Sequence, residues 1–146
     1  MTTSSEPLIA FSPPWAAALA DALRANEDYR RHAQTWEGTL AFVLAADAEA
    51  TGRGVVLDLW HGDCRDARSV EAPDGGAALD VDYVIRGNAA AWERVLTGSL
   101  EPIFGLMSGK LKLVRGKLTG LTPYIKASKA IVQSAVDIGS QLPDDA

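Results

Sequence analysis

The chain has 146 residues and a formal net charge of −5 at neutral pH, with 47% apolar and 23% charged residues. This is the composition of one ordinary globular domain, and a chain of this length can bury roughly 70% of its unfolded surface. No run approaches the roughly 18 apolar residues of a membrane-spanning helix, and the N-terminus lacks the pattern of a signal peptide. Cys64 is the single cysteine, which excludes an intrachain disulfide. Since that fits a reducing compartment, we expect a cytoplasmic protein.

The first half of the chain predicts two helices followed by four strands. Ser12 before two prolines predicts a helix start, with an amphipathic helix to about residue 26. Asn26 can cap a second helix that ends at Gly38. Apolar–polar alternation then predicts strands at 39–45, 55–60, 64–70 and 79–86. Short turns join these strands, so we expect antiparallel pairing.

The second half predicts three helical segments and a fifth strand. Asn88 can cap a helix that ends at Gly98, and residues 101–107 can form one or two helical turns. Residues 110–114 alternate as a strand, and Thr122 before a proline predicts the start of a last helix. The expected fold class is α+β, with a five-stranded, mostly antiparallel sheet covered on one face by helices. We expect a single domain over residues 1–146, with flexible tails at 1–7 and 140–146.

Charge is distributed unevenly along the chain. All five lysines and Arg115 lie in a stretch, residues 102–136, that contains no aspartate or glutamate. This stretch is either a solvated basic face or a surface that meets an anionic ligand group or membrane. We expect no nucleic-acid partner, because the whole chain is acidic and lacks interleaved basic and aromatic residues.

Residues suited to catalysis are few and scattered. Asp58, Asp80 and Asp82 could act as general acids or bases only if they were buried together, and a wet sheet face is the simpler interpretation. His61 and Cys64 flank a turn, but no third and fourth metal ligands accompany them. We therefore expect no enzymatic activity, no metal and no cofactor.

Apolar residues are concentrated beside glycines in the last third of the chain. They could be plain core, or they could be the wall of a ligand cavity, which is mostly apolar and in which methionine adapts to different shapes. Composition alone leaves both interpretations open. The residues are Trp92, Leu96, Leu100, Ile103, Phe104, Leu106, Met107 and Tyr124.

The same region carries a combination of residues that resembles a known signature. It consists of Trp92, Leu96 and Gly98, the pair Glu101-Pro102, and the run Gly109-Lys110-Leu111-Lys112-Leu113 followed by Gly116 and Leu118. Together with the order of elements upstream, this resembles the sterol carrier protein 2 domain family over residues 8–138.

The resemblance implies a function. In that family a hydrophobic tunnel between sheet and helices holds a fatty acid, acyl-CoA, sterol or other lipid without catalysis. Carried over, Ile103, Phe104, Leu106 and Met107 would line the tunnel near its mouth, and Tyr124 and Ile125 would border it. The expected ligand-binding set is completed by Trp92 and Leu100. The expected partners are a lipid or fatty-acyl ligand, a membrane in transient contact, and a second copy of the chain.

Two other functions remain open at this stage. The chain could be an interaction or dimerisation module with a degenerate cavity, because the apolar arc of the last helix is wide. It could also be an enzyme that transfers protons through a tyrosine or aspartate in an apolar pocket. The enzyme hypothesis requires a buried carboxylate.

Overall fold

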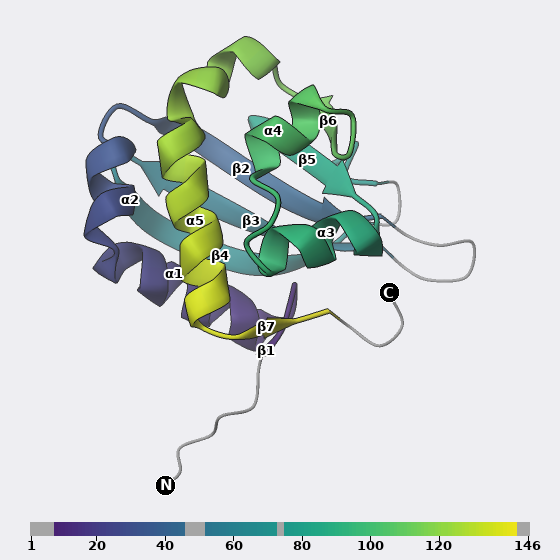
Figure 1. Cartoon of the computed structure of the whole chain (residues 1–146), viewed down its shortest axis with the longest axis horizontal. Coiled ribbons are helices and arrows are strands. Elements are labelled where there is room, and N and C mark those ends of the chain that lie inside the picture. Colours follow the sequence, from purple (N-terminus) through teal and green to yellow (C-terminus); the bar gives the residue numbers. More distant parts are fainter. Residues whose placement is uncertain (1–7, 46–51, 73–74, 143–146) are drawn as a thin grey trace, which may run out of the picture.

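The computed structural model describes residues 8–45, 52–72 and 75–142, which form an α+β fold around one five-stranded sheet (Figure 1). The strand order is β4-β3-β2-β5-β6. Three of the four pairings are antiparallel, and only β2 with β5 is parallel. The strands are β2 (Glu37–Leu44), β3 (Arg53–Trp60), β4 (Asp63–Glu71), β5 (Tyr83–Gly87) and β6 (Lys112–Arg115). The predicted five-stranded, mostly antiparallel sheet is confirmed.

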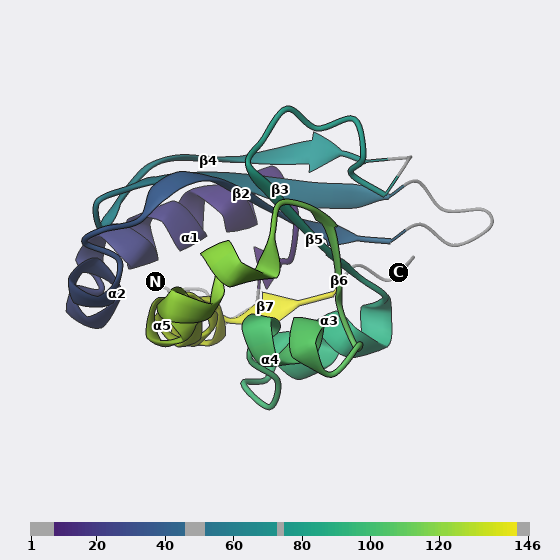
Figure 2. The same ribbon diagram turned by 90° about the horizontal axis from the view of Figure 1, so that it is seen from above.

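The helices lie together on one side of this sheet (Figure 2). They are α1 (Pro13–Ala25), α2 (Glu27–His32), α3 (Ala89–Leu96), α4 (Pro102–Met107) and α5 (Ile125–Asp137), with 3₁₀ helices η1 (Leu118–Gly120) and η2 (Thr122–Tyr124) before α5. The helix α5 crosses the middle of the sheet (Figure 1). The main core, which includes Trp15, Leu57 and Ile131, lies between the helices and the sheet.

Polar side chains start the helices where the sequence predicts them. The side chains of Asn26 and Asn88 accept hydrogen bonds from the backbone N–H groups three residues on, at 3.0 and 2.8 Å, as N-caps do. Ser12 caps α1 in the same way. Thr122 does not cap the last helix, because the chain is already helical in η2 before α5 begins. The second helix also ends earlier than predicted, at His32.

The connection from β4 to β5 produces the one parallel pairing within the five-stranded sheet. After β4 the chain returns across β3 and β2 and pairs β5 with the far side of β2, with Leu40 opposite Tyr83. Residues 75–82 make this crossing over the sheet face opposite the helices (Figure 2). The predicted strand at 79–86 is therefore wrong in its first half, since Val81 packs onto that face instead of pairing in the sheet. Both sheet faces consequently carry buried apolar side chains.

The two ends of the described chain meet in a small second sheet. The strand β1 (Leu8–Ile9) pairs in parallel with β7 (Ser140–Gln141). Ser140 also accepts a hydrogen bond from the indole nitrogen of Trp15 at 2.6 Å. The structure thus places the first residues of the expected tail 140–146 in an ordered pairing. Residues 1–7 and 143–146 lie outside the described part of the chain.

Candidate functional site

A small apolar cavity lies between the sheet and α5. Its volume is about 30 Å³. Strands β2, β3 and β5 form its floor, while α2, α4 and α5 form its walls. Its polar side-chain groups are three hydroxyls and one indole N–H. The lining residues are Tyr29, Ala33, Trp36, Leu40, Phe42, Leu59, Ile85, Ile103, Leu121, Tyr124, Ala127, Ser128 and Ile131.

A second apolar cavity of about 20 Å³ continues in the same layer toward α1 and α3. Phe42 of β2 and Ile131 of α5 line both cavities, so these two side chains form the partition between them. Phe42 is 6% exposed and Ile131 is 6% exposed. The other lining residues of the second cavity are Phe11, Trp15, Leu19, Trp92, Val95, Leu96, Val132 and Ala135.

These volumes are small for a ligand site. A cavity of about 30 Å³ holds one or two water-sized bodies, whereas pockets for small organic ligands span roughly 300–1,000 Å³. In the part of the chain that the structure describes, two small apolar cavities therefore stand where a tunnel was expected. A hydrophobic ligand would have to displace side chains to enter.

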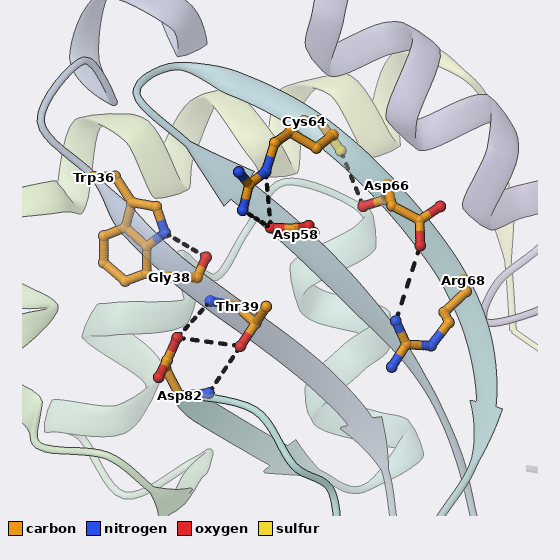
Figure 3. Close-up of polar contacts among 9 residues, drawn as sticks. Trp36, Gly38, Thr39, Asp58, Cys64, Asp66, Arg68 and Asp82 are labelled. Carbon is orange, nitrogen blue, oxygen red and sulfur yellow. Dashed lines mark hydrogen bonds and ion pairs between the residues drawn. The ribbon is translucent and has the colours of Figure 1, made fainter.

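Tyr124 closes the first cavity toward solvent. Its ring packs edge-on against Trp36, with centroids 4.9 Å apart and an interplanar angle of 88°. Its hydroxyl lies 2.9 Å from the hydroxyl of Thr35, on the connection between α2 and β2. Trp36 is held in turn by a 3.0 Å hydrogen bond from its indole N–H to the carbonyl of Gly38 (Figure 3). One half-buried tyrosine thus spans the gap between η2 and the α2–β2 connection.

Glu101 fastens the short helix α4 to the cavity wall. Its carboxylate accepts hydrogen bonds from the backbone N–H of Ile103 at 2.8 Å and of Phe104 at 3.0 Å. The hydroxyl of Ser128 on α5 donates to the same carboxylate. Since Ile103 and Ser128 both line the first cavity, this carboxylate fixes two of its walls relative to each other. In the sequence, the pair Glu101-Pro102 stands before an apolar run, but nothing there indicated that its carboxylate would join two walls of a cavity.

The eight expected ligand-binding residues divide into three groups. Ile103 and Tyr124 line the first cavity, and Trp92 lines the second. Leu100, Leu106 and Ile125 pack in or against the core beside them. Phe104 and Met107, at 45% and 56% exposure, point away from both cavities. Phe104 follows Ile103 by one residue, a rotation of about 100° around the helix, so it faces outward when Ile103 faces inward. Met107 is the last residue of the helix.

Sequence reasoning missed the strand and α5 residues that complete the walls. Leu40, Phe42 and Ile85 alternate along strands just as ordinary core residues do, so nothing in their local pattern marks a cavity. Ile131 lies on the buried side of α5 and Ser128 is half-buried beside it, which is also ordinary for a helix that packs on a sheet. Only the meeting of these faces in space reveals that they enclose empty volume.

A larger hollow of about 310 Å³ lies elsewhere, beside the N-terminus of α1. Its walls include Arg53 and Glu71, and it is more open and more polar than the two cavities under α5. Because it lacks the apolar, enclosed character of a lipid site, it is a poorer candidate than the smaller cavities under α5.

Two of the three candidate catalytic aspartates form structural contacts, and none of the three is buried. Asp58 pairs with Arg65 at 2.9 Å. The carboxylate of Asp82 accepts hydrogen bonds from the backbone N–H and hydroxyl of Thr39, at 2.9 and 3.2 Å (Figure 3). Asp80 and Asp82 are exposed, and Asp58 is only half-buried. The buried carboxylate required for proton-transfer catalysis is thus not found among these three.

Cys64 is a buried thiol with no sign of activation. Its Sγ lies 3.5 Å from the carbonyl oxygen of Asp66 (Figure 3). Burial raises the pKa of this thiol from 9.0 to about 11, which keeps it protonated and unreactive at neutral pH. Within the described ranges, no group of three or more histidine, cysteine or carboxylate residues could hold a metal ion.

Comparison with known proteins agrees with this architecture. The model of the SCP-2 sterol transfer family matches residues 19–117. The chain belongs to the SCP-2 sterol transfer family. A crystal structure of sterol carrier protein 2 shares 40% sequence identity and a TM-score of 0.81, covering 89% of this chain and 99% of that one. The fold and family expected from the resemblance are thus confirmed.

Two further structures of the same kind extend this family comparison. The solution structure of a conserved hypothetical protein from Thermus thermophilus, described as possibly a sterol carrier protein, shares 38% identity and a TM-score of 0.82, with full coverage of both chains. Sterol carrier protein 2 from Yarrowia lipolytica, in its apo form, shares 16% identity and a TM-score of 0.51 over 83% of this chain and 88% of that one, which supports the fold alone. No curated protein matches the chain. None of the helices that the structure describes has the length and apolarity to cross a bilayer.

Proposed function

We propose that this chain binds a hydrophobic ligand, such as a fatty-acyl chain or a sterol-like lipid, without catalysis. The binding site lies between the sheet and α5. The observation that carries the proposal is the pair of apolar cavities, lined mainly by buried residues, that share Phe42 and Ile131. Membership of the SCP-2 sterol transfer family supports the same ligand class.

The cavities must expand for a lipid to enter, and the structure offers a route of low energy. Swinging Tyr124 outward breaks its hydroxyl–hydroxyl bond with Thr35, which costs about 1 kcal/mol. It also breaks the edge-on ring contact with Trp36, which costs about 0.5–1.5 kcal/mol more. Each CH₂ group buried from water contributes about 0.8 kcal/mol. Burial of a chain of several carbons would therefore offset the free energy needed to move Tyr124, which we call the gate. Moving Phe42 or Ile131 adds a further cost. Burial of the ligand thus supplies the free energy that keeps the site open.

The chemistry of the lining favours an orientation in which a ligand's polar end lies at the mouth. No lysine or arginine of the described chain lines either cavity, so a buried carboxylate or phosphate would have no counter-charge there. Exposed Lys126 follows Tyr124 by two residues. An anionic head group would therefore remain at the Tyr124 side, in contact with water and this lysine, while its apolar chain is buried.

The experiment is native mass spectrometry of the purified protein, followed by lipid extraction and displacement of a fluorescent fatty acid. We expect a co-purifying lipid or saturable binding of the probe at one site per chain. The absence of both would refute the proposal. It would instead support the alternative of an interaction module whose cavity is degenerate.

A further inference from the structure

The outer face of α4 exposes apolar side chains to water. The described part of the chain has four large exposed apolar residues, and two of them, Phe104 at 45% and Met107 at 56%, lie on this one short helix. They are three positions apart and so share a face. The helix and the turn after it stand on the side of the helical layer farthest from the sheet (Figure 2).

The same helix is fixed on its inner side, so this exposure is not the result of loose packing. Ile103 is 2% exposed and lines the first cavity. Gly105 packs so closely on Leu111 that an added Cβ would lie 2.8 Å from that side chain. The Glu101 carboxylate caps the first turn and holds it to Ser128. A helix anchored in this way must present Phe104 and Met107 to whatever lies outside.

Exposed lysines lie on the segments next to this apolar face. Lys110 lies in the turn that follows α4, and Lys126 and Lys129 lie on the exposed side of α5, the helix that Glu101 bonds through Ser128. All five lysines of the chain, together with Arg115, are exposed, and none forms an ion pair with another described residue. The stretch from 102 to 136 has no acidic residue, and the neighbouring carboxylate of Glu101 is engaged by the backbone of α4 and by Ser128.

We propose that this surface, made of Phe104, Met107, Lys110, Lys126 and Lys129, docks the protein on an anionic phospholipid bilayer. Exposed aromatic and flexible apolar side chains enter the boundary between head groups and acyl chains, while lysines bind the anionic head groups around them. A second copy of the chain fits less well. A two-fold dimer would place the same cationic patch against itself, where like charges repel.

The proposal rests on the proposed function and identifies the side of the protein from which a lipid would enter the cavity. Ile103, on the inner side of α4, is the immediate neighbour of Phe104, so the helix that touches the bilayer is also a wall of the lipid cavity. Docking brings that wall to the membrane surface. A lipid could then pass between bilayer and cavity beside α4 without crossing open water.

Co-sedimentation with vesicles tests the surface directly, without any bound lipid ligand. We expect the protein to bind vesicles of phosphatidylcholine mixed with phosphatidylglycerol and to dissociate from them as the salt concentration rises. Vesicles of phosphatidylcholine alone should bind it weakly or not at all. The double substitution Phe104→Ser and Met107→Ser should weaken binding by about tenfold or more. Changing Lys110, Lys126 and Lys129 to Gln should weaken it by about a hundredfold, roughly fivefold for each lysine.

Matched control variants separate the patch from general surface effects. Trp60→Ser removes another exposed apolar residue, 41% exposed and at the end of β3, and should leave vesicle binding unchanged. Changing the exposed arginines Arg30, Arg31 and Arg68 to Gln removes the same net charge elsewhere and should weaken binding far less than the lysine variant. Circular dichroism melts of every variant should stay close to that of the parent, since the ion pairs of Arg31 and Arg68 and the ring contacts of Trp60 are at the surface.

Three outcomes would overturn the proposal. One is equal binding to neutral and anionic vesicles, and another is an effect of the control variants as large as that of the α4 variants. The third is a dimer in light scattering that the Phe104 and Met107 substitutions dissolve, with no effect on vesicle binding. Binding of a fluorescent fatty acid in the absence of vesicles is measured separately. Vesicle docking without fatty-acid binding would refute the lipid-carrier function while the docking surface stands.

Discussion

Ile131 is the residue on which the cavity hypothesis can be tested most sharply. It is 6% exposed on the inner side of α5 and separates the two cavities of about 30 and 20 Å³. Ile131→Ala removes three carbon atoms from this partition. The two cavities and the vacated volume would then form one continuous apolar space.

The cost to stability can be estimated from the burial of the side chain. The lost transfer free energy is about 2.4 kcal/mol at roughly 0.8 kcal/mol per carbon group, and the new cavity raises the total to about 3–4 kcal/mol. A domain of this size is stable by roughly 5–15 kcal/mol, so the variant should still fold. Urea unfolding measures this loss.

Ligand binding should recover much of the loss if the space is a lipid site. A ligand at 100 times its dissociation constant stabilises the folded state by about 2.7 kcal/mol. We therefore expect a saturating medium-chain fatty acid to raise the unfolding free energy of Ile131→Ala more than that of the parent protein. The fluorescent probe should also bind the variant more tightly, because the partition no longer has to move.

Leu23→Ala is the matched control. Leu23 is fully buried on α1, loses the same three carbons, and lines neither cavity. Its stability loss should be similar, but fatty acid should stabilise it no more than the parent. If both variants respond to fatty acid alike, or if Ile131→Ala binds the probe less well than the parent, the two cavities are packing defects and the reasoning fails.

Three further predictions concern the gate, a turn and the buried thiol. Tyr124→Phe removes the hydroxyl bond to Thr35 and should speed uptake of the fluorescent probe in stopped-flow mixing, at a stability cost of about 1 kcal/mol or less; unchanged uptake would exclude Tyr124 as the gate. Gly109 has φ of +80° with open space around its Cβ position, so Gly109→Val should destabilise by about 1–2 kcal/mol through backbone strain alone, and Gly109→Asn by less; an equal loss in urea unfolding would contradict this. The pKa of Cys64 is raised on folding from 9.0 to about 11, so its contribution to stability is complete below pH 9 and is lost as the pH rises to about 11. Unfolding free energies of Cys64→Ala should therefore fall less steeply over that window than those of the parent, and identical slopes would refute the assignment.

Local chemistry made much of the fold predictable. Asn26 and Asn88 start helices because each side chain satisfies a backbone donor only a few residues away. The alternation around Phe42 marks a strand because the period of side chains along a strand is two. Such signals operate within a few residues, so the sequence carries them completely.

Other features were decided only by the tertiary structure. The parallel pairing of β2 with β5 depends on a crossing in which Val81 packs on the far sheet face, and alternation alone made that segment look like a strand. The same limit applies to the site. From the sequence, Ile103 and Phe104 were equally apolar neighbours, and the Glu101–Ser128 contact sets which of them lines the cavity and which meets solvent.

What the sequence determined by itself is the family, the order of elements and the basic, acid-free surface, because these are properties of residue identity and local period. What the tertiary structure alone decided is where empty volume remains and which apolar side chains stay exposed. Those depend on how faces of β2, α4 and α5, far apart in the chain, fill the space between them. Phe42 and Ile131 are ordinary core residues in the sequence and become the partition of a cavity only when their elements meet.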